Sequence, residues 1–185
     1  YEYDGAGNQI AAVNPKGEAT RMEYDGMNQL VRTIAPDGSV QTAEYDFNGN
    51  VKKVSNALRE TVTYEYDANG NAISQTDAAG NRTTFEYDSM NRMTTQTNAA
   101  GARTVYVYDE LTGKLAKTVD ADGNETQFQY DANGNQIKQI NPDGTTVTTE
   151  YDSLNRPVKT TDANGGVSII EYNPDSSIAA TIDAT

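Results

Sequence analysis

The sequence of 185 residues contains no cysteine, no tryptophan and no histidine. The absence of cysteine excludes a disulfide framework. The absence of both cysteine and histidine excludes thiolate or imidazole metal sites and Cys–His or Ser–His nucleophile pairs. Long hydrophobic runs are also lacking, so no segment is expected to insert into a membrane. No signal-peptide pattern opens the chain, and Tyr1 is expected to begin a fragment or a mature piece of a protein.

Charge of one sign dominates the chain, because 27 acidic residues stand against 14 basic ones and the formal net charge is −13. The sequence pI of about 4.3 argues against a nucleic-acid partner, which requires a basic surface. Only 36% of the residues are hydrophobic, and such a composition by itself points towards disorder, because little apolar area is available to offset chain entropy. The composition leaves an acidic, non-catalytic module.

What the chain does have is an internal repeat that starts from Tyr-Asp. The tyrosines are Tyr3, Tyr24, Tyr45, Tyr66, Tyr87, Tyr108, Tyr130 and Tyr151, with Tyr172-Asn173 as a degenerate ninth copy. The spacing is 21 residues, except for 22 residues between Tyr108 and Tyr130, where an extra residue falls in an expected turn over 110–113. Gly recurs fourteen residues after most of the tyrosines, and Arg59 breaks that pattern. Residues 1–185 are therefore expected to form a single tandem array.

Each repeat unit is predicted to contain two short strands and two turns. Val62, Tyr64 and Tyr66 alternate with polar residues, which is the pattern of a half-buried strand. A turn over 67–71 follows, then a second strand over 73–76 and a second turn over 77–80; the Asn-Gly of the first turn supplies a positive φ. No helix is expected, because Gly, Asn and Thr interrupt every apolar stripe.

Two all-β architectures fit this period: a meander of antiparallel hairpins and a parallel β-helix. A glutamate precedes most of the tyrosines, for example Glu44 and Glu65. In a β-helix these like charges would stack about 4.8 Å apart, whereas an intervening strand in a meander separates them by roughly 9.6 Å. The sequence therefore favours tandem antiparallel hairpins in a curved sheet or spiral, because an open sheet of about sixteen strands would normally curl.

The motif Tyr-Asp-x-x-Gly-Asn/Arg-hydrophobic, as in residues 45–51 and 87–93, resembles the YD repeat. That repeat belongs to Rhs proteins, insecticidal Tc toxin complexes, bacterial wall-associated proteins and teneurins. The resemblance covers essentially the whole chain. It implies a strip of hairpins that spirals into a hollow shell, which in bacterial toxins encloses a C-terminal toxic domain. An Asp-Pro-x-Gly-Leu-like motif that ends such shells is absent, so the chain resembles an internal fragment.

The resemblance implies a non-catalytic scaffold in the wall of a large bacterial protein that is secreted or displayed at the cell surface. The implied partners are flanking repeats of the parent protein and an enclosed toxin domain. A cell-surface adhesion module that binds carbohydrate or a protein partner remains the alternative. The Tyr column could serve as a sugar-stacking platform, although a structural ladder of rings is favoured.

No catalytic, cofactor-binding or metal-ligating residue is expected. The acidic turns over 67–71 and 120–124 resemble the start of a calcium loop, but their Gly stands at position 4 and no phased Glu follows. Asp and Asn are expected instead to close these turns by side-chain hydrogen bonds. Close carboxylate pairs occur at repeat-equivalent positions rather than at a local break, which argues against acid–base catalysis. Lys52 and Lys53 are expected to be solvated.

Overall fold

The computed structural model describes residues 1–184 and contains strands but no helix in this range. The strands are β1 (Glu2–Tyr3), β2 (Gln9–Val13), β3 (Ala19–Tyr24), β4 (Leu30–Ile34), β5 (Val40–Tyr45), β6 (Val51–Ser55), β7 (Thr61–Tyr66), β8 (Ala72–Thr76), β9 (Arg82–Tyr87), β10 (Met93–Thr97), β11 (Arg103–Tyr108), β12 (Leu115–Val119), β13 (Glu125–Tyr130), β14 (Gln136–Ile140), β15 (Thr146–Tyr151), β16 (Pro157–Thr161), β17 (Val167–Tyr172) and β18 (Ile178–Ala184). They form two compact units, Tyr1–Gly101 with β1–β10 and Ala102–Thr185 with β11–β18.

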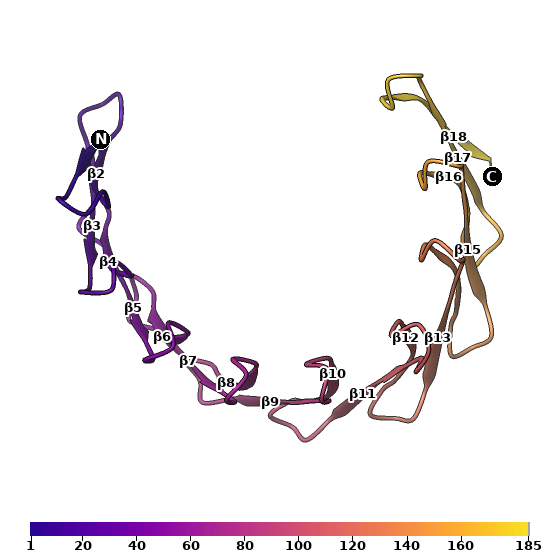
Figure 1. Cartoon of the computed structure of the whole chain (residues 1–185), viewed down its shortest axis with the longest axis horizontal. Helices are drawn as coiled ribbons and strands as arrows, with labels where there is room; N and C mark the ends of the chain where they lie inside the picture. The colour runs from indigo at the N-terminus through magenta and orange to yellow at the C-terminus, as the bar shows by residue number, and fades with distance from the viewer. Residues whose placement is uncertain (185) are drawn as a thin grey trace. The chain divides into compact units, whose positions relative to one another are not determined.

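Each unit is a meander in which every strand pairs antiparallel with the next one along the chain (Figure 1). In the first unit β7 pairs with β8 through Tyr64 and Gln75, and β8 pairs with β9 through Gln75 and Thr83. The predicted all-β class and the hairpin repeat are confirmed, and the parallel β-helix alternative is wrong. An isolated two-stranded hairpin is only marginally stable in water, so each hairpin depends on its neighbours for stability.

The predicted elements match the strands closely. The second strand of the 66 repeat runs from Ala72 to Thr76, one residue longer than expected. The extra residue of the 22-residue copy lies in the turn between β11 and β12, as predicted. There the Gly113 amide donates to the carbonyl of Asp109 at 2.8 Å, four residues back, whereas the Gly70 amide reaches only three residues back, to Asp67. The inserted residue thus widens one turn and leaves the strands in phase.

Every Tyr-Asp hairpin also carries a β-bulge that the periodicity did not predict. Tyr66 lies opposite Ala72 while Glu65 lies opposite Ser74, so Ile73 is the extra residue on β8. The same shift occurs at the equivalent position of β3–β4, β5–β6, β13–β14, β15–β16 and β17–β18. A bulge increases the local twist of the sheet and bends the bulged strand. A repeated bulge therefore bends every hairpin in the same sense.

The two faces of the strip differ in chemistry. One face, called here the aromatic face, carries Val62, Tyr64 and Tyr66 of β7 and the equivalent residues of the other strands. The opposite face, called the charged face, carries Thr63 and Glu65 with their cross-strand partners. In strands β3–β7 every charged side chain except that of the bulge residue Lys52 lies on the charged face. These residues are Arg21, Glu23, Arg32, Glu44, Lys53 and Glu65.

Burial is shallow in a strip of this kind. Among the described residues the buried side chains are small ones, namely Ala11, Ser74 and Thr95, each less than 5% exposed. All three occupy the same repeat position, opposite the glutamate that precedes Tyr. No large side chain in the described range is fully buried, so hairpin-to-hairpin contacts, rather than a thick core, hold the repeats together.

Candidate functional site: the clamp between neighbouring hairpins

The aspartate of each Tyr-Asp pair closes its own turn. Asp67 Oδ1 accepts hydrogen bonds from the backbone amides of Asn69 and Asn71, both at 2.9 Å. Asp67 Oδ2 accepts a third from Asn71 Nδ2, also at 2.9 Å. These bonds, the Asn71 side-chain bond first, lower the pKa of Asp67 because they favour the charged form. The turn role predicted for Asp is thus confirmed, and no cluster of metal-ligating side chains occurs among residues 1–184.

The turns require a positive φ at one position, which Gly70 supplies with a φ of 85°. Where glycine is missing, the residue at that position adopts the same conformation; these residues are Asn28, Asn91, Asn155, Ser176 and, in the second turn of its repeat, Arg59 with a φ of 64°. Arg59 therefore breaks the sequence pattern without breaking the turn. A non-glycine residue in this region carries a steric cost between Cβ and the backbone.

In most repeats the tyrosine bonds to the backbone of the preceding hairpin. The Tyr66 hydroxyl donates to the Val51 carbonyl oxygen at 2.8 Å. The register between β6 and β7 ends at the Lys53–Thr63 pair, so Val51 lies beyond this ladder. The hydroxyl thus donates a hydrogen bond to a carbonyl oxygen of β6 that lies beyond the residues paired with β7. Equivalent bonds join Tyr24 to Gln9, Tyr45 to Leu30, Tyr87 to Ala72, Tyr151 to Gln136 and Tyr172 to Pro157, at 2.9–3.2 Å.

Partial burial raises the pKa of the Tyr66, Tyr87 and Tyr130 hydroxyls, because an exposed phenolate would be hydrated and a buried one is not. For Tyr66 the carboxylate of Asp46, in the preceding turn, adds to this effect. The rings are therefore packed as neutral groups along the edge of the strip that carries the Tyr-Asp turns. This arrangement favours the structural ladder over a platform of free rings for sugars.

A second contact joins several of the Tyr-Asp turns to the next one. Asn91 Oδ1 accepts hydrogen bonds from Asn71 Nδ2 at 2.8 Å and from Asn69 Nδ2 at 3.1 Å. The same latch joins Asn133 and Asn135 to Asn155, at 3.0 and 2.9 Å, and Asn8 to Asn28 at 2.8 Å. Sequence reasoning missed these latches. The available signal was an Asn twenty residues after another Asn, at turn positions where one copy has no glycine.

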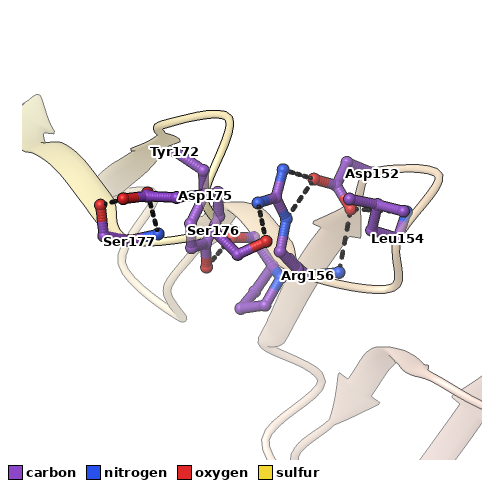
Figure 2. Close-up of polar contacts among 8 residues, drawn as sticks. Asp152, Leu154, Arg156, Tyr172, Asp175, Ser176 and Ser177 are labelled. Atoms are coloured by element: carbon purple, nitrogen blue, oxygen red, sulfur yellow. Dashed lines mark hydrogen bonds and ion pairs between the residues drawn. The ribbon is translucent and has the colours of Figure 1, made fainter.

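Arg156 forms the most extensive version of the latch, shown in Figure 2. Its Nε and Nη2 atoms hold Asp152 Oδ2 at 2.8 and 2.7 Å within its own turn. Its Nη1 donates to Ser176 Oγ in the next turn at 3.1 Å, and its Cζ lies 4.2 Å from the centroid of the Tyr172 ring. The Tyr172 hydroxyl in turn donates to the Pro157 carbonyl at 3.0 Å. A planar guanidinium can make all these contacts at once, which an ammonium cannot.

The charged face carries ion pairs both within and between hairpins. Glu44 Oε1 lies 2.8 Å from Lys53 Nζ, directly across the strand pair, so Lys53, whose side chain is 39% exposed, is ion-paired as well as solvated. Equivalent pairs within one hairpin are Glu23–Arg32 and Glu150–Lys159. Two further pairs link neighbouring hairpins: Lys117–Glu125 joins β12 to β13, and Glu65–Arg82 reaches across β8 from β7 to β9. The glutamates are thus separated by basic or small residues of the intervening strands. A Lys or Arg nine residues after the glutamate was the signal in the sequence.

One hollow of about 730 Å³ lies in the first unit, lined by apolar side chains that include Leu30, Val54 and Val62. It forms around Ala43, which occupies the repeat position that Tyr64 fills in the next copy. Glu60 and Asp77 contribute to its lining, but Glu60 is bonded to Asn56 and Asp77 closes its own turn through Asn81. The hollow therefore brings together no free acid–base pair.

The chain is thus a strip of repeated antiparallel hairpins in which hydrogen bonds join neighbouring turns. The RHS Repeat family matches residues 3–40, 45–79, 66–104, 108–146 and 130–167, which together are more than half of the chain. The chain belongs to the RHS repeat family. No curated protein matches it.

Solved structures agree with this fold. The crystal structures of TcdB2-TccC3 and of TcdB2-TccC3 without its hypervariable C-terminal region each match with a TM-score of 0.66 and 15% sequence identity. Each match covers 97% of this chain and 12% of the other chain. The chain thus spans about one eighth of the length of these structures. No helix in the described range is long and apolar enough to cross a membrane.

Proposed function

We propose that residues 1–185 act as one array in the wall of a hollow β-shell, within a larger secreted bacterial protein, and that this shell encloses a polypeptide cargo. The observation that carries the proposal is the set of hydrogen bonds between neighbouring hairpins, such as Tyr66–Val51 and Asn71–Asn91. Tyrosine hydroxyls and turn latches join neighbouring hairpins, and in the described range no buried side-chain polar atom lacks a hydrogen-bond partner. Such a strip can extend by adding further repeats at either end, which is what a wall requires.

The two faces fit two different environments. The charged face, with ion pairs such as Glu44–Lys53, suits the solvent side, where a net charge of −13 keeps the protein soluble. The aromatic face presents rings and aliphatic side chains, and suits the side that meets an enclosed and incompletely folded chain. The repeated bulge at positions such as Ile73 supplies a bend of constant sense, as a closed wall needs.

The partners follow from this arrangement. Further RHS repeats would pair with the outermost strands, because a sheet edge offers free backbone donors and acceptors. The cargo would lie against the aromatic face. The RHS repeat family and the fold shared with TcdB2-TccC3 support this proposal, and no catalytic role is assigned to the strip itself.

Gln41 and Thr42 provide a matched pair for the test, because they are adjacent in β5, both exposed, and on opposite faces. The chain contains no cysteine of its own. The variants Gln41→Cys and Thr42→Cys are made in the isolated chain and in the longer protein that contains it, and are treated with a bulky polyethylene-glycol maleimide. Both sites should react in the isolated strip, whereas only Thr42→Cys should react in the longer protein. Equal labelling of Gln41→Cys in the longer protein contradicts an enclosed aromatic face.

A further inference from the structure

Four turns of the strip contain the dipeptide Asn-Gly, at residues 48–49, 69–70, 133–134 and 164–165. Their backbones are alike. In each turn the glycine amide donates a 3.1 Å hydrogen bond to the carbonyl oxygen of the turn's first aspartate, and each glycine has a φ between 85° and 93°. The backbone hydrogen bond and the glycine conformation therefore do not distinguish the four turns, whereas the asparagine side chains do.

The side chains divide into two pairs. Asn69 Nδ2 is bonded to Asn91 Oδ1 at 3.1 Å, and Asn133 Nδ2 is bonded to Asn155 Oδ1 at 3.0 Å, through the latches described above. Asn48 and Asn164 are exposed, and in the described range their side chains make no hydrogen bond. Two carboxamides are thus held against the next hairpin, and two are free to rotate.

Rotation of the carboxamide matters because Asn-Gly can form a succinimide. The glycine backbone nitrogen loses its proton and attacks the asparagine Cγ, the bond between Cγ and Nδ2 breaks, and the amide leaves as ammonia. Water then opens the ring at either carbonyl and yields aspartate or isoaspartate. Glycine permits the reaction because it has no side chain to block the approach. The overall balance consumes one water and releases one ammonia.

We propose that Asn48 and Asn164 are spontaneous deamidation sites of the folded strip and that the inter-hairpin latches protect Asn69 and Asn133. A latched carboxamide must first break its bond to Asn91 or Asn155 before Cγ can turn towards the glycine nitrogen. The unlatched ones have no such requirement. The latch therefore has a chemical role besides its structural one, since it preserves the neutral amides on which its own hydrogen bonds depend.

The protection is self-reinforcing. Conversion of Asn69 would replace the Nδ2 donor by a carboxylate oxygen facing Asn91 Oδ1, and two acceptors cannot bond to each other. Conversion of Asn48 has no such consequence and adds a negative charge at a turn tip beside Phe47, which is fully exposed. Deamidation is thus confined to the turns where it leaves the clamps intact. This inference does not depend on the proposed shell function.

The test is incubation of the purified chain at mildly alkaline pH, with peptide mapping by mass spectrometry and separation of the isoaspartate products. We expect Asn48 and Asn164 to deamidate several-fold faster than Asn69 and Asn133. Equal rates at all four sites, or faster reaction at Asn69, would overturn the proposal.

A second arm removes the latch without touching the reacting residues. Asn91→Gly deletes the acceptor Oδ1 and keeps the turn, because glycine already stands at the equivalent position in Gly49 and Gly70. Deamidation of Asn69 should rise towards the rate of Asn48, while Asn48 and Asn133 serve as references in the same molecule. Acceleration at all sites together would indicate unfolding, and Asn155→Gly, read at Asn133, then repeats the test in the second unit. No change at Asn69 in a folded Asn91→Gly chain contradicts protection by the latch.

Discussion

The hydroxyl of Tyr66 donates a 2.8 Å hydrogen bond to the carbonyl oxygen of Val51, fifteen residues earlier in the chain. This bond joins two hairpins at the edge where their strands no longer pair. It explains why the motif contains tyrosine rather than any large hydrophobic residue: the ring packs on the aromatic face while the hydroxyl satisfies a backbone acceptor. The next residue, Asp67, closes its own turn. Tyr66 therefore bonds to the preceding hairpin, whereas Asp67 bonds within its own hairpin.

Removal of this hydroxyl should weaken the array. In Tyr66→Phe the Val51 carbonyl loses its donor while the ring is kept, so the free energy of unfolding should fall by about 1 kcal/mol. Tyr130→Phe is the control, because in the described range the Tyr130 hydroxyl makes no hydrogen bond and its ring contact with Lys114 survives the change. Urea unfolding measures both variants. Equal losses would show that the hydroxyl bond contributes nothing specific.

Arg59 should be a position where the chain gains stability. Its φ of 64° places Cβ in a strained region that glycine occupies freely in the equivalent turns. Arg59→Gly is expected to raise the free energy of unfolding by about 1 kcal/mol, since the cost of the left-handed conformation exceeds the added freedom of the unfolded chain. The reciprocal variant Gly80→Ala, at a φ of 86°, should lower it. A destabilised Arg59→Gly chain would mean that the arginine side chain contributes more than its strain costs.

Acid should loosen the turns. Hydrogen bonds from Asn71 lower the pKa of Asp67 below its ordinary value, so the charged carboxylate stabilises the folded state above the unfolded-state pKa of about 3.9. That contribution is lost as the pH falls through the lower, folded-state pKa. In Asn71→Ala the Asp67 pKa should rise towards its ordinary value, as carboxyl NMR titration can measure. Asp143, whose pKa is lowered through Thr145, should not change in this variant.

The charged face should respond to salt. Glu44 and Lys53 lie directly opposite each other and their side chains are 39–60% exposed, so a double-mutant cycle should give a coupling of about 0.2–1 kcal/mol. Lys53→Glu places two carboxylates opposite each other and should destabilise the chain. Added salt should relieve most of that loss, because exposed charges are screened. A loss that is independent of ionic strength would assign the effect to packing of the lysine stem instead.

The repeat, the strand order and the turns could be predicted from the sequence, because the alternation of apolar and polar residues between turn residues is a local signal. The bulge at Ile73 was not predicted, since an extra residue in a strand leaves the spacing of the tyrosines unchanged. The Tyr66–Val51 bond and the Asn71–Asn91 latch were also missed, because each joins residues fifteen or twenty positions apart across a register that only the paired strands define. The Glu44–Lys53 pair could have been predicted, because in the meander two residues that stand nine positions apart in this way lie opposite each other on one face.

A cryo-EM map of the longer protein that contains this chain would show whether the strip coils into an enclosing wall. We expect a closed wall in which residues 1–185 form one arc, with Lys53 on the outer surface, Tyr66 on the inner surface, and additional polypeptide density within. An open strip with solvent on both faces, or a wall with Lys53 on the inside, would contradict it.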